Sequence, residues 1–264
     1  MDIKGKRFVL TGASGGIGQE LAKQLSYQGA SLVLVGRNAI ALNQLAAELP
    51  DTIVIRADLG CELDFDYLVN QLKRMALDGV IQAAGLNAFA TLDRLNKNAL
   101  DTMIQTNLLA PMQLTQALLP QLLARPSAVL LNVGSTLGSI GYAGYSAYCA
   151  CKFGLRGFCE SMRRELASTD GRVLYVAPRA TATEMNSDAV TKMNRQLGVA
   201  MDSPKFVAAQ IVRAIEQESA VTYLGWPEKL FARINGVAPG LVDKSLAKQL
   251  PTIQTYAKQQ HSAL

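Results

Sequence analysis

The chain has 264 residues, of which 49% are hydrophobic and 18% are charged, and it carries a formal net charge of +5 at pH 7. Charged residues and glycines interrupt its apolar runs before they reach the length of about 20 residues that crosses a bilayer, so no transmembrane helix is expected. The basic residues are scattered, without the runs that follow a phosphate backbone, which argues against a nucleic-acid ligand.

The N-terminal residues run directly into a strand-like segment at Phe8, which leaves no room for the apolar core of a secretion signal. Three of the four cysteines, Cys149, Cys151 and Cys159, are crowded into one predicted helix. This spacing is unlike a disulfide framework, and the sequence has no second cysteine pair or histidine cluster to complete a metal site. We therefore expect reduced thiols, no bound metal and a cytoplasmic location.

The position of the only histidine excludes most histidine chemistry. His261 lies in a polar tail at the C-terminal end. A Ser-His-Asp hydrolase or a histidine-based metal site needs an interior imidazole, so tyrosine, lysine, aspartate, glutamate or cysteine must transfer any proton.

Short apolar runs alternate with helical patterns along the chain, which is typical of βαβ units. Strands are predicted at residues 7–10, 31–35, 52–55, 79–82, 128–133, 172–176 and 220–224. Helices are predicted at residues 17–28, 39–49, 65–75, 98–123, 146–168 and 204–217. The pattern predicts an α/β fold: a single-domain, Rossmann-type, doubly wound parallel sheet of about seven strands with helices on both faces. We expect this domain to cover residues 1–225.

Residues 226–264 are predicted to form an amphipathic helical extension packed on the same domain. Apolar residues recur at helical spacing, at Leu230, Phe231, Ile234 and Val237 and again at Leu241, Val242, Leu246 and Leu250. The favoured interpretation is packing against the domain or a second subunit. The alternative is a weak peripheral membrane contact or a lid over an apolar substrate. The looser pattern over residues 179–199 fits either a mobile segment over a site or an ordinary loop–helix connection.

A glycine-rich turn lies between the first predicted strand and the first predicted helix. Glycine lets the backbone approach a pyrophosphate closely, and the N-terminus of the helix presents unpaired N–H groups to the anion. In a parallel sheet this turn is where a dinucleotide binds. The expected binding residues are Gly12, Ser14, Gly15, Gly16, Ile17 and Gly18.

The end of the second predicted strand indicates which dinucleotide binds. An acidic residue there would accept a hydrogen bond from a free ribose 2′-hydroxyl and repel a phosphate. The chain instead has Gly36, followed by Arg37 and Asn38. A planar cation with no opposing charge favours NADP(H) over NAD(H). The alternative for Arg37 is a solvated surface cation.

Tyr148 and Lys152 are four residues apart on a predicted helix and so share one face. A tyrosine that exchanges protons near neutral pH needs its phenolate favoured by about 2–3 units from its ordinary pKa of about 10. A neighbouring ammonium has the right charge to do this. Alone the pair is a weak signal, because helices carry many such pairs on solvated faces.

Ser135 follows a buried strand pattern at the C-terminal edge of the predicted sheet and precedes Tyr148 by thirteen residues. Together with the glycine-rich turn, this arrangement resembles the short-chain dehydrogenase/reductase (SDR) family, and the resemblance covers about residues 5–225. It implies a catalytic set of Asn107, Ser135, Tyr148 and Lys152.

The resemblance also implies a mechanism. A hydride passes between the nicotinamide and the substrate carbon, while Tyr148 exchanges the proton with the substrate oxygen and Ser135 hydrogen-bonds that oxygen. Lys152 binds the nicotinamide ribose and lowers the pKa of the tyrosine, and Asn107 holds a water that links the lysine to solvent. Further cofactor contacts are implied at Asp58, Leu59, Ala84, Gly85, Pro178 and Thr183.

The sequence departs from the family pattern at two places. The family's Asn-Asn-Ala-Gly is Gln82-Ala83-Ala84-Gly85 here, and its Pro-Gly is Pro178-Arg179. The first change removes two asparagines expected on the adenosine side. The arginine at 179 is compatible with contact to cofactor phosphate, to substrate or to water.

Together these patterns predict an NADP(H)-dependent oxidoreductase that interconverts a ketone and a secondary alcohol. The alternatives are a non-enzymatic NADP(H)-binding regulatory or scaffold protein and an epimerase or dehydratase on the same fold. The expected substrate is a small, apolar carbonyl or alcohol, since Met185, Met193 and Met201 suggest an adaptable apolar pocket. The two long predicted helices resemble the surfaces through which family members form homodimers or homotetramers.

Overall fold

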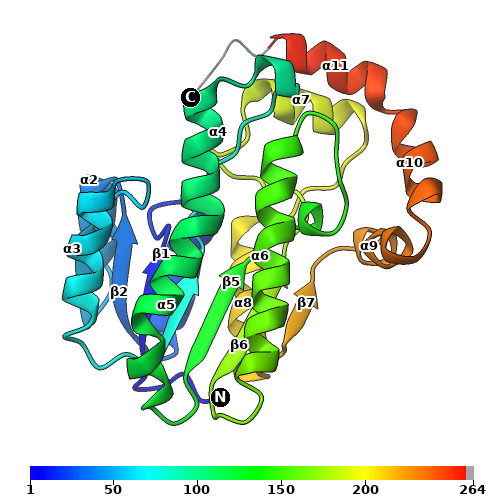
Figure 1. The fold of residues 1–264 in the computed structure, drawn as a ribbon. Coiled ribbons are helices and arrows are strands. Elements are labelled where there is room, and N and C mark those ends of the chain that lie inside the picture. Colours follow the sequence, from blue (N-terminus) through cyan, green and yellow to red (C-terminus); the bar gives the residue numbers. More distant parts are fainter. Residues whose placement is uncertain (260–264) are drawn as a thin grey trace.

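The computed structural model describes residues 1–259, so His261 lies outside the described residues. Seven strands form one parallel sheet in the order β3-β2-β1-β4-β5-β6-β7 (Figure 1). The strands are β1 (Arg7–Thr11), β2 (Ser31–Gly36), β3 (Thr52–Arg56), β4 (Gly79–Gln82), β5 (Val129–Val133), β6 (Arg172–Ala177) and β7 (Val221–Tyr223). The predicted Rossmann-type doubly wound sheet is confirmed.

Helices cover both faces of the sheet (Figure 1). The helices are α1 (Gly16–Tyr27), α2 (Ala39–Ala47), α3 (Glu62–Leu72), α4 (Lys97–Ile104), α5 (Ala110–Leu123), α6 (Ser146–Glu165), α7 (Asp188–Gln196), α8 (Pro204–Glu216), α9 (Glu228–Val237), α10 (Pro239–Ala247) and α11 (Leu250–Gln259). The apolar faces of α1, α2 and α8 share one core with the sheet, and those of α3, α5 and α6 share the other. Central strands such as β5 are therefore buried along their whole length.

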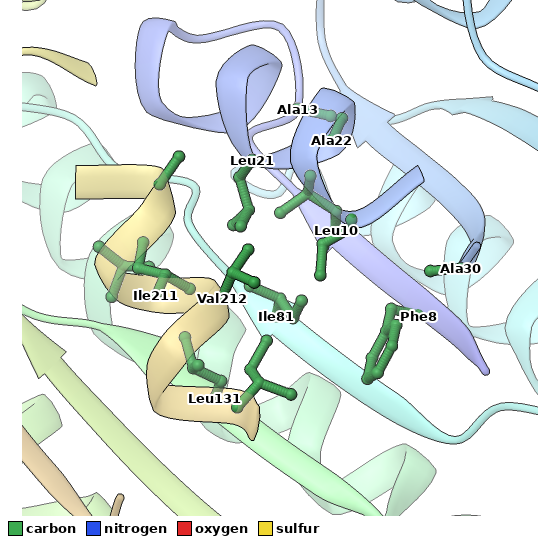
Figure 2. Close-up of a cluster of buried hydrophobic side chains, with 14 of the residues drawn as sticks. Phe8, Leu10, Ala13, Leu21, Ala22, Ala30, Ile81, Leu131, Ile211 and Val212 are labelled. Carbon is green, nitrogen blue, oxygen red and sulfur yellow. The ribbon is translucent and has the colours of Figure 1, made fainter. Parts of the chain in front are cut away.

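The core between the sheet, α1 and α8 is built from side chains that alternate along the strands (Figure 2). Phe8 and Leu10 of β1 face it together with Ile81 of β4 and Leu131 of β5. Strand order reverses between β1 and β4, and ligands of such sheets bind at the C-terminal edge beside this reversal. The core thus fixes the strands whose ends form the site.

The helix predicted over residues 98–123 is interrupted in the structure. A π-helical turn, Gln105–Leu109, separates α4 from α5, and the Ala110 N–H bonds to the Gln105 carbonyl. The α-helical donor to the Asn107 carbonyl would be residue 111, which is a proline and has no N–H. The proline explains why the continuous helix is lost here, and single π turns of this kind are frequent at functional sites.

The C-terminal helices α9, α10 and α11 form an arc at the outer margin of the molecule (Figure 1). Helix α11 of the arc packs on α7, and α9 contacts the short turn Thr136–Gly138. Val242 is buried, but Leu230, Val237 and Leu241 are exposed. Packing against the domain therefore does not account for these three residues. Within residues 1–259, no helix is both long and apolar enough to cross a membrane.

Replacement of Leu131 by alanine tests the role of the core. Leu131 is fully buried in the central strand, so its truncation should lower the free energy of unfolding by about 2–5 kcal/mol. The matched control is Ile40→Ala on α2, where the side chain is exposed and the change should stay within about 0.5 kcal/mol. Urea unfolding measures both, and equal losses would contradict this account of the core.

Candidate active site

A cavity of about 780 Å³ lies at the C-terminal edge of the sheet, within the size range of small-molecule and cofactor sites. Its wall combines the glycine-rich turn, the segments after β4, β5 and β6, and residues of α7, α9 and α10. The sequence-predicted residues that line it are Gly12, Gly15, Gly16, Ile17, Gly18, Arg37, Ala84, Gly85, Ser135, Tyr148, Lys152, Pro178 and Thr183.

The turn between β1 and α1 fits only glycine at two positions. Gly12 has φ +70°, and a Cβ there would lie 2.7 Å from the Ala84 Cα. A Cβ on Gly18 would lie 2.1 Å from the Gly12 carbonyl oxygen. Helix α1 begins at Gly16, and its N-cap Gly15 has no side chain to cap the first N–H groups. The turn therefore offers a close-fitting cradle with free donors for a phosphate group.

Arg37 lies at the same edge of the cavity, just after β2. Its side chain is exposed and forms no ion pair with any described residue, so its charge is available to a ligand. Gly36 leaves space beside Ser14, since a Cβ on Gly36 would lie 3.0 Å from the Ser14 Oγ. Asn38 caps α2, accepting the Ala41 N–H at 3.1 Å. Ser14 and Asn38 are not among the described residues that line the cavity.

Asp58 and Leu59 lie after β3, farther along the same edge of the sheet. The Asp58 Oδ1 accepts the Gly60 N–H at 2.9 Å, and Leu59 is buried in the core. Neither is among the described residues that line the cavity. Their predicted contact with a cofactor stays a prediction.

The structure brings Tyr148, Lys152 and Ser135 together at the end of β5. Tyr148 and Lys152 come from the first part of α6, and Ser135 follows β5 by two residues. The Tyr148 phenol lies near enough to the Ser135 side chain to interact with it. The Lys152 Nζ donates to the Val133 carbonyl oxygen at 3.0 Å and lies 5.7 Å from the centre of the Tyr148 ring. A phenol, a hydroxyl and an ammonium thus face one cavity.

Burial sets the protonation of this group in the free protein. It raises the pKa of Tyr148 to about 12, although the interaction with the Ser135 side chain acts in the opposite direction. It also lowers the pKa of Lys152 to about 8, since the ammonium is almost fully buried. The net shift of the Tyr148 pKa in the free protein is upward, opposite to the lowering expected from Lys152, because burial is its largest cause. The phenol is therefore protonated at neutral pH.

Asn107 lies in the π-helical turn and is fully buried. Its side chain bonds the backbone of Leu86 at both ends: Oδ1 accepts the N–H and Nδ2 donates to the carbonyl oxygen, each at 2.7 Å. A Cβ on Gly85 would lie 3.4 Å from the Asn107 Oδ1 and 3.9 Å from the Lys152 Nζ. Asn107 therefore fixes the segment after β4 beside the lysine from behind the cavity wall.

Gln82 replaces the first asparagine of the family pattern and has a structural role here. Its buried Nε2 donates to the Pro111 carbonyl at 3.1 Å and to the Thr115 Oγ1 at 3.0 Å. These bonds hold the end of β4 against α5. The side chain is not among the described residues that line the cavity.

Arg179 lines the cavity and is bound by two carboxylates. Its Nη2 and Nε lie 2.8 and 3.1 Å from the two carboxylate oxygens of Asp202, and its Nη1 lies 3.5 Å from the Glu228 Oε2. Gly225, at φ +90°, leaves the space for this group, since a Cβ would lie 2.5 Å from the Arg179 Cδ. The arginine thus joins the loop after β6 to the segment before α8 and to α9, and the three contacts compatible with the sequence stay open.

Sequence analysis missed much of the apolar wall. Tyr142, Tyr145 and Ile140 line the cavity and carry no motif. Phe231 and Leu246 also line it, and they belong to the C-terminal apolar stripes that the sequence indicated. Tyr145 gives the one available signal, because it precedes Tyr148 by three residues and so shares its side of the chain.

The three methionines predicted at an apolar pocket are not equivalent. Met185 lines the cavity, Met193 is buried in the core, and Met201 is not among the described lining residues. Asn87, beside Tyr145, is another lining residue that the sequence did not indicate.

Comparison with known proteins agrees with this geometry. The family model for short chain dehydrogenases matches residues 6–194. An uncharacterized oxidoreductase of Staphylococcus epidermidis is 32% identical over 222 residues, which are 83% of this chain and 94% of that protein. The ketoacyl reductase HetN of a Nostoc species is 30% identical over 255 residues, covering 92% of this chain and 88% of the relative.

A solved structure shares the fold. It is a short-chain dehydrogenase from Sphingobium yanoikuyae in complex with NADPH, with a TM-score of 0.78, 24% sequence identity, and coverage of 90% of this chain and 95% of that one. The chain belongs to the short-chain dehydrogenase family of oxidoreductases, whose members act on small-molecule substrates.

The buried lysine predicts an unusual dependence of stability on pH. The pKa of Lys152 is about 8 in the folded protein, against the ordinary value near 10.4 in the unfolded chain, so the folded protein releases this proton first as pH rises. The free energy of unfolding should therefore rise between pH 8 and 9.5 by about 1–2 kcal/mol more in the unmodified protein than in Lys152→Met. Urea unfolding over this range measures the difference, and parallel pH profiles would contradict the burial of a titrating ammonium.

Proposed function

We propose that this chain is an NADP(H)-dependent oxidoreductase that interconverts a ketone and a secondary alcohol, with Tyr148 as general acid and base. The observation that supports it most is the convergence of Tyr148, Ser135 and Lys152 on the cavity that also contains the glycine-rich turn. The NADPH bound to the similar dehydrogenase of Sphingobium yanoikuyae adds support for the cofactor.

The residues present fit such a cofactor. The close-packed turn at Gly12 and Gly18 and the uncapped start of α1 suit a pyrophosphate. The unpaired Arg37 suits a 2′-phosphate, and Thr183 stands over the turn, with its Cγ2 3.1 Å from the position of a Cβ on Gly16. When bound, the nicotinamide supplies or accepts the hydride.

The chain's own residues handle the proton and the substrate oxygen. In the reducing direction the carbonyl carbon gains a hydride and its oxygen gains the proton of the Tyr148 Oη, which gives a secondary alcohol. A phenol that is protonated at neutral pH suits this step, and Ser135 holds the same oxygen. In the oxidising direction the tyrosine takes the proton back.

Lys152 is a positioning and electrostatic residue in this scheme. With a pKa of about 8 it is mostly charged at pH 7, and its ammonium stabilises the phenolate that forms when Tyr148 gives up its proton. Asn107 fixes the wall beside it, and the carbonyl of Asn107, without a donor at Pro111, is suited to hold the water of a proton relay.

The cavity wall favours an apolar carbonyl substrate. Leu137, Ile140, Val190, Leu197 and Phe231 contribute to it between Tyr148 and the C-terminal helices. A bulky hydrophobic ketone would bury apolar surface there. A boundary at residue 225 between the domain and its extension stays part of this proposal.

Exposed apolar residues on the two long helices support homo-oligomers. Leu109 in the π turn, Met112 and Leu123 on α5 and Phe153 on α6 are exposed. We propose a homodimer or homotetramer formed through this surface. Free thiols at Cys149, Cys151 and Cys159 suit a reducing compartment such as the cytoplasm.

Tyr148→Phe tests the proton carrier. NADPH oxidation with a panel of apolar ketones should lose about a hundredfold or more in kcat, because the proton donor is gone. Tyr145→Phe is the matched control: it removes a hydroxyl from the same cavity and should change kcat by less than about tenfold. Comparable kcat in Tyr148→Phe and the unmodified protein would defeat the mechanism, and loss in both variants would point to a general effect on the cavity.

Arg37→Gln tests the cofactor preference. Removing the cation should weaken NADPH binding by about tenfold and leave NADH binding nearly unchanged, because only NADPH carries a 2′-phosphate. Titration calorimetry measures both dissociation constants. Equal changes for the two nucleotides would show that Arg37 does not recognise the phosphate.

A further inference from the structure

The outer face of α9 and α10 carries large apolar side chains that no described part of the chain covers. Val237 is 89% exposed, Trp226 is 69% exposed and Leu241 is 64% exposed, and Leu230 is also exposed. We define the α9–α10 face by these four apolar residues and the four cations Lys229, Arg233, Lys244 and Lys248. It lies at the outer margin of the molecule (Figure 1).

These helices also present apolar residues inward. Phe231, Val242 and Leu246 line the cavity, and Trp226, just before α9, borders it as well as being exposed. Leu230, Val237 and Leu241 are not among the described lining residues. Leu230 and Val237 are seven residues apart, two turns along one side of α9. The exposed side is therefore not a set of core residues left over from imperfect packing.

The charges around these apolar residues have one sign. Lys229, Arg233, Lys244 and Lys248 are exposed, and none forms an ion pair with a described residue. Of the two acidic residues of α9 and α10, Glu228 is paired with Arg179, which leaves Asp243. The face therefore has four cations available to a ligand and one exposed carboxylate.

The charge pattern distinguishes between occupants of the face. In a twofold homodimer the same patch meets itself, so the four cations would face four cations of the second copy. An anionic bilayer surface instead pairs the cations with headgroup phosphates and accepts the apolar side chains at the acyl boundary. An exposed tryptophan is well suited to that boundary, because its ring is apolar and its N–H is polar.

We propose that the α9–α10 face docks this protein on an anionic lipid bilayer. Val237 and Leu241 enter the acyl boundary, and the four cations lie at the level of the headgroups. The proposal does not depend on the catalytic assignment, since neither Val237 nor Leu241 lines the cavity.

Vesicle binding of the full chain tests the proposal directly. The protein should sediment with vesicles of phosphatidylglycerol and phosphatidylcholine and remain largely in solution with vesicles of phosphatidylcholine alone. Trp226 is the only tryptophan of the chain and is exposed just before α9, where it also borders the cavity, so its fluorescence reports on the surroundings of this end of the face. A blue shift should accompany binding to the anionic vesicles, and sedimentation with no shift would place the contact elsewhere on the protein.

Two double variants separate the apolar and the charged contributions. Val237→Glu with Leu241→Glu should abolish binding to the anionic vesicles. Lys244→Gln with Lys248→Gln should lower the partition coefficient by about 30-fold, from about 1 kcal/mol for each cation near an anionic surface.

Each variant has a matched control away from the face. Ile40→Glu with Leu63→Glu changes two exposed apolar residues on α2 and α3, and Lys73→Gln with Arg74→Gln neutralises two exposed cations after α3. Both controls should bind vesicles within about twofold of the unmodified protein. Equal binding by a face variant and its control would overturn the proposal.

Solution measurements distinguish the other outcomes. Two results together would show that the face is a subunit interface and that the proposal fails. The unmodified protein would not bind anionic vesicles, and the variant Val237→Glu with Leu241→Glu would elute as a smaller species in size-exclusion chromatography. NADPH oxidation without vesicles should be the same in this variant and in the unmodified protein. If the glutamates unfold the chain, the variant Val237→Ser with Leu241→Ser takes their place. This variant should lose vesicle binding, and retained binding would contradict the proposal.

Discussion

The burial of one ammonium group organises the candidate site. Lys152 has almost no exposed surface, and its Nζ donates a hydrogen bond of 3.0 Å to the Val133 carbonyl oxygen at the end of β5. A buried cation is expensive without such a partner, so this contact fixes the start of α6 against the end of β5. The position of Tyr148 beside Ser135 follows from it.

Simple geometry explains why these residues occur at their spacing. Two residues of extended chain from Val133 to Ser135 rise by about 6.6 Å, and four residues of helix from Lys152 back to Tyr148 rise by about 6 Å. The two contacts, Val133 with Lys152 and Ser135 with Tyr148, are therefore formed by one alignment of strand end and helix start. The chain that connects the end of β5 to the start of α6 must therefore have a defined length. This constraint explains why the thirteen-residue interval from Ser135 to Tyr148 is a useful signal in the sequence.

The sequence predicted most of what depends on local pattern. The strands and the glycine-rich turn follow from periodicity and spacing, and they lie where the pattern predicts. The set of Ser135, Tyr148 and Lys152 was implied by the family resemblance, and these three residues line one cavity. The π turn at Asn107 was missed, although Pro111 lies in the middle of the helix predicted over residues 98–123, where a proline signals an interruption.

The remaining misses depend on contacts between distant segments. The direction of the Tyr148 pKa shift depends on how deeply folding buries the phenol. The ion pairs of Arg179 join residues 23 and 49 positions away, and no local pattern carries that information.

The most direct measurement of the central claim is an NMR titration of the protein labelled with ¹³C at lysine Cε, with Lys152 assigned from Lys152→Arg. The account predicts one lysine that titrates near pH 8 and whose resonance shifts when NADPH is added. A Lys152 signal that titrates with the other lysines and ignores NADPH would contradict it.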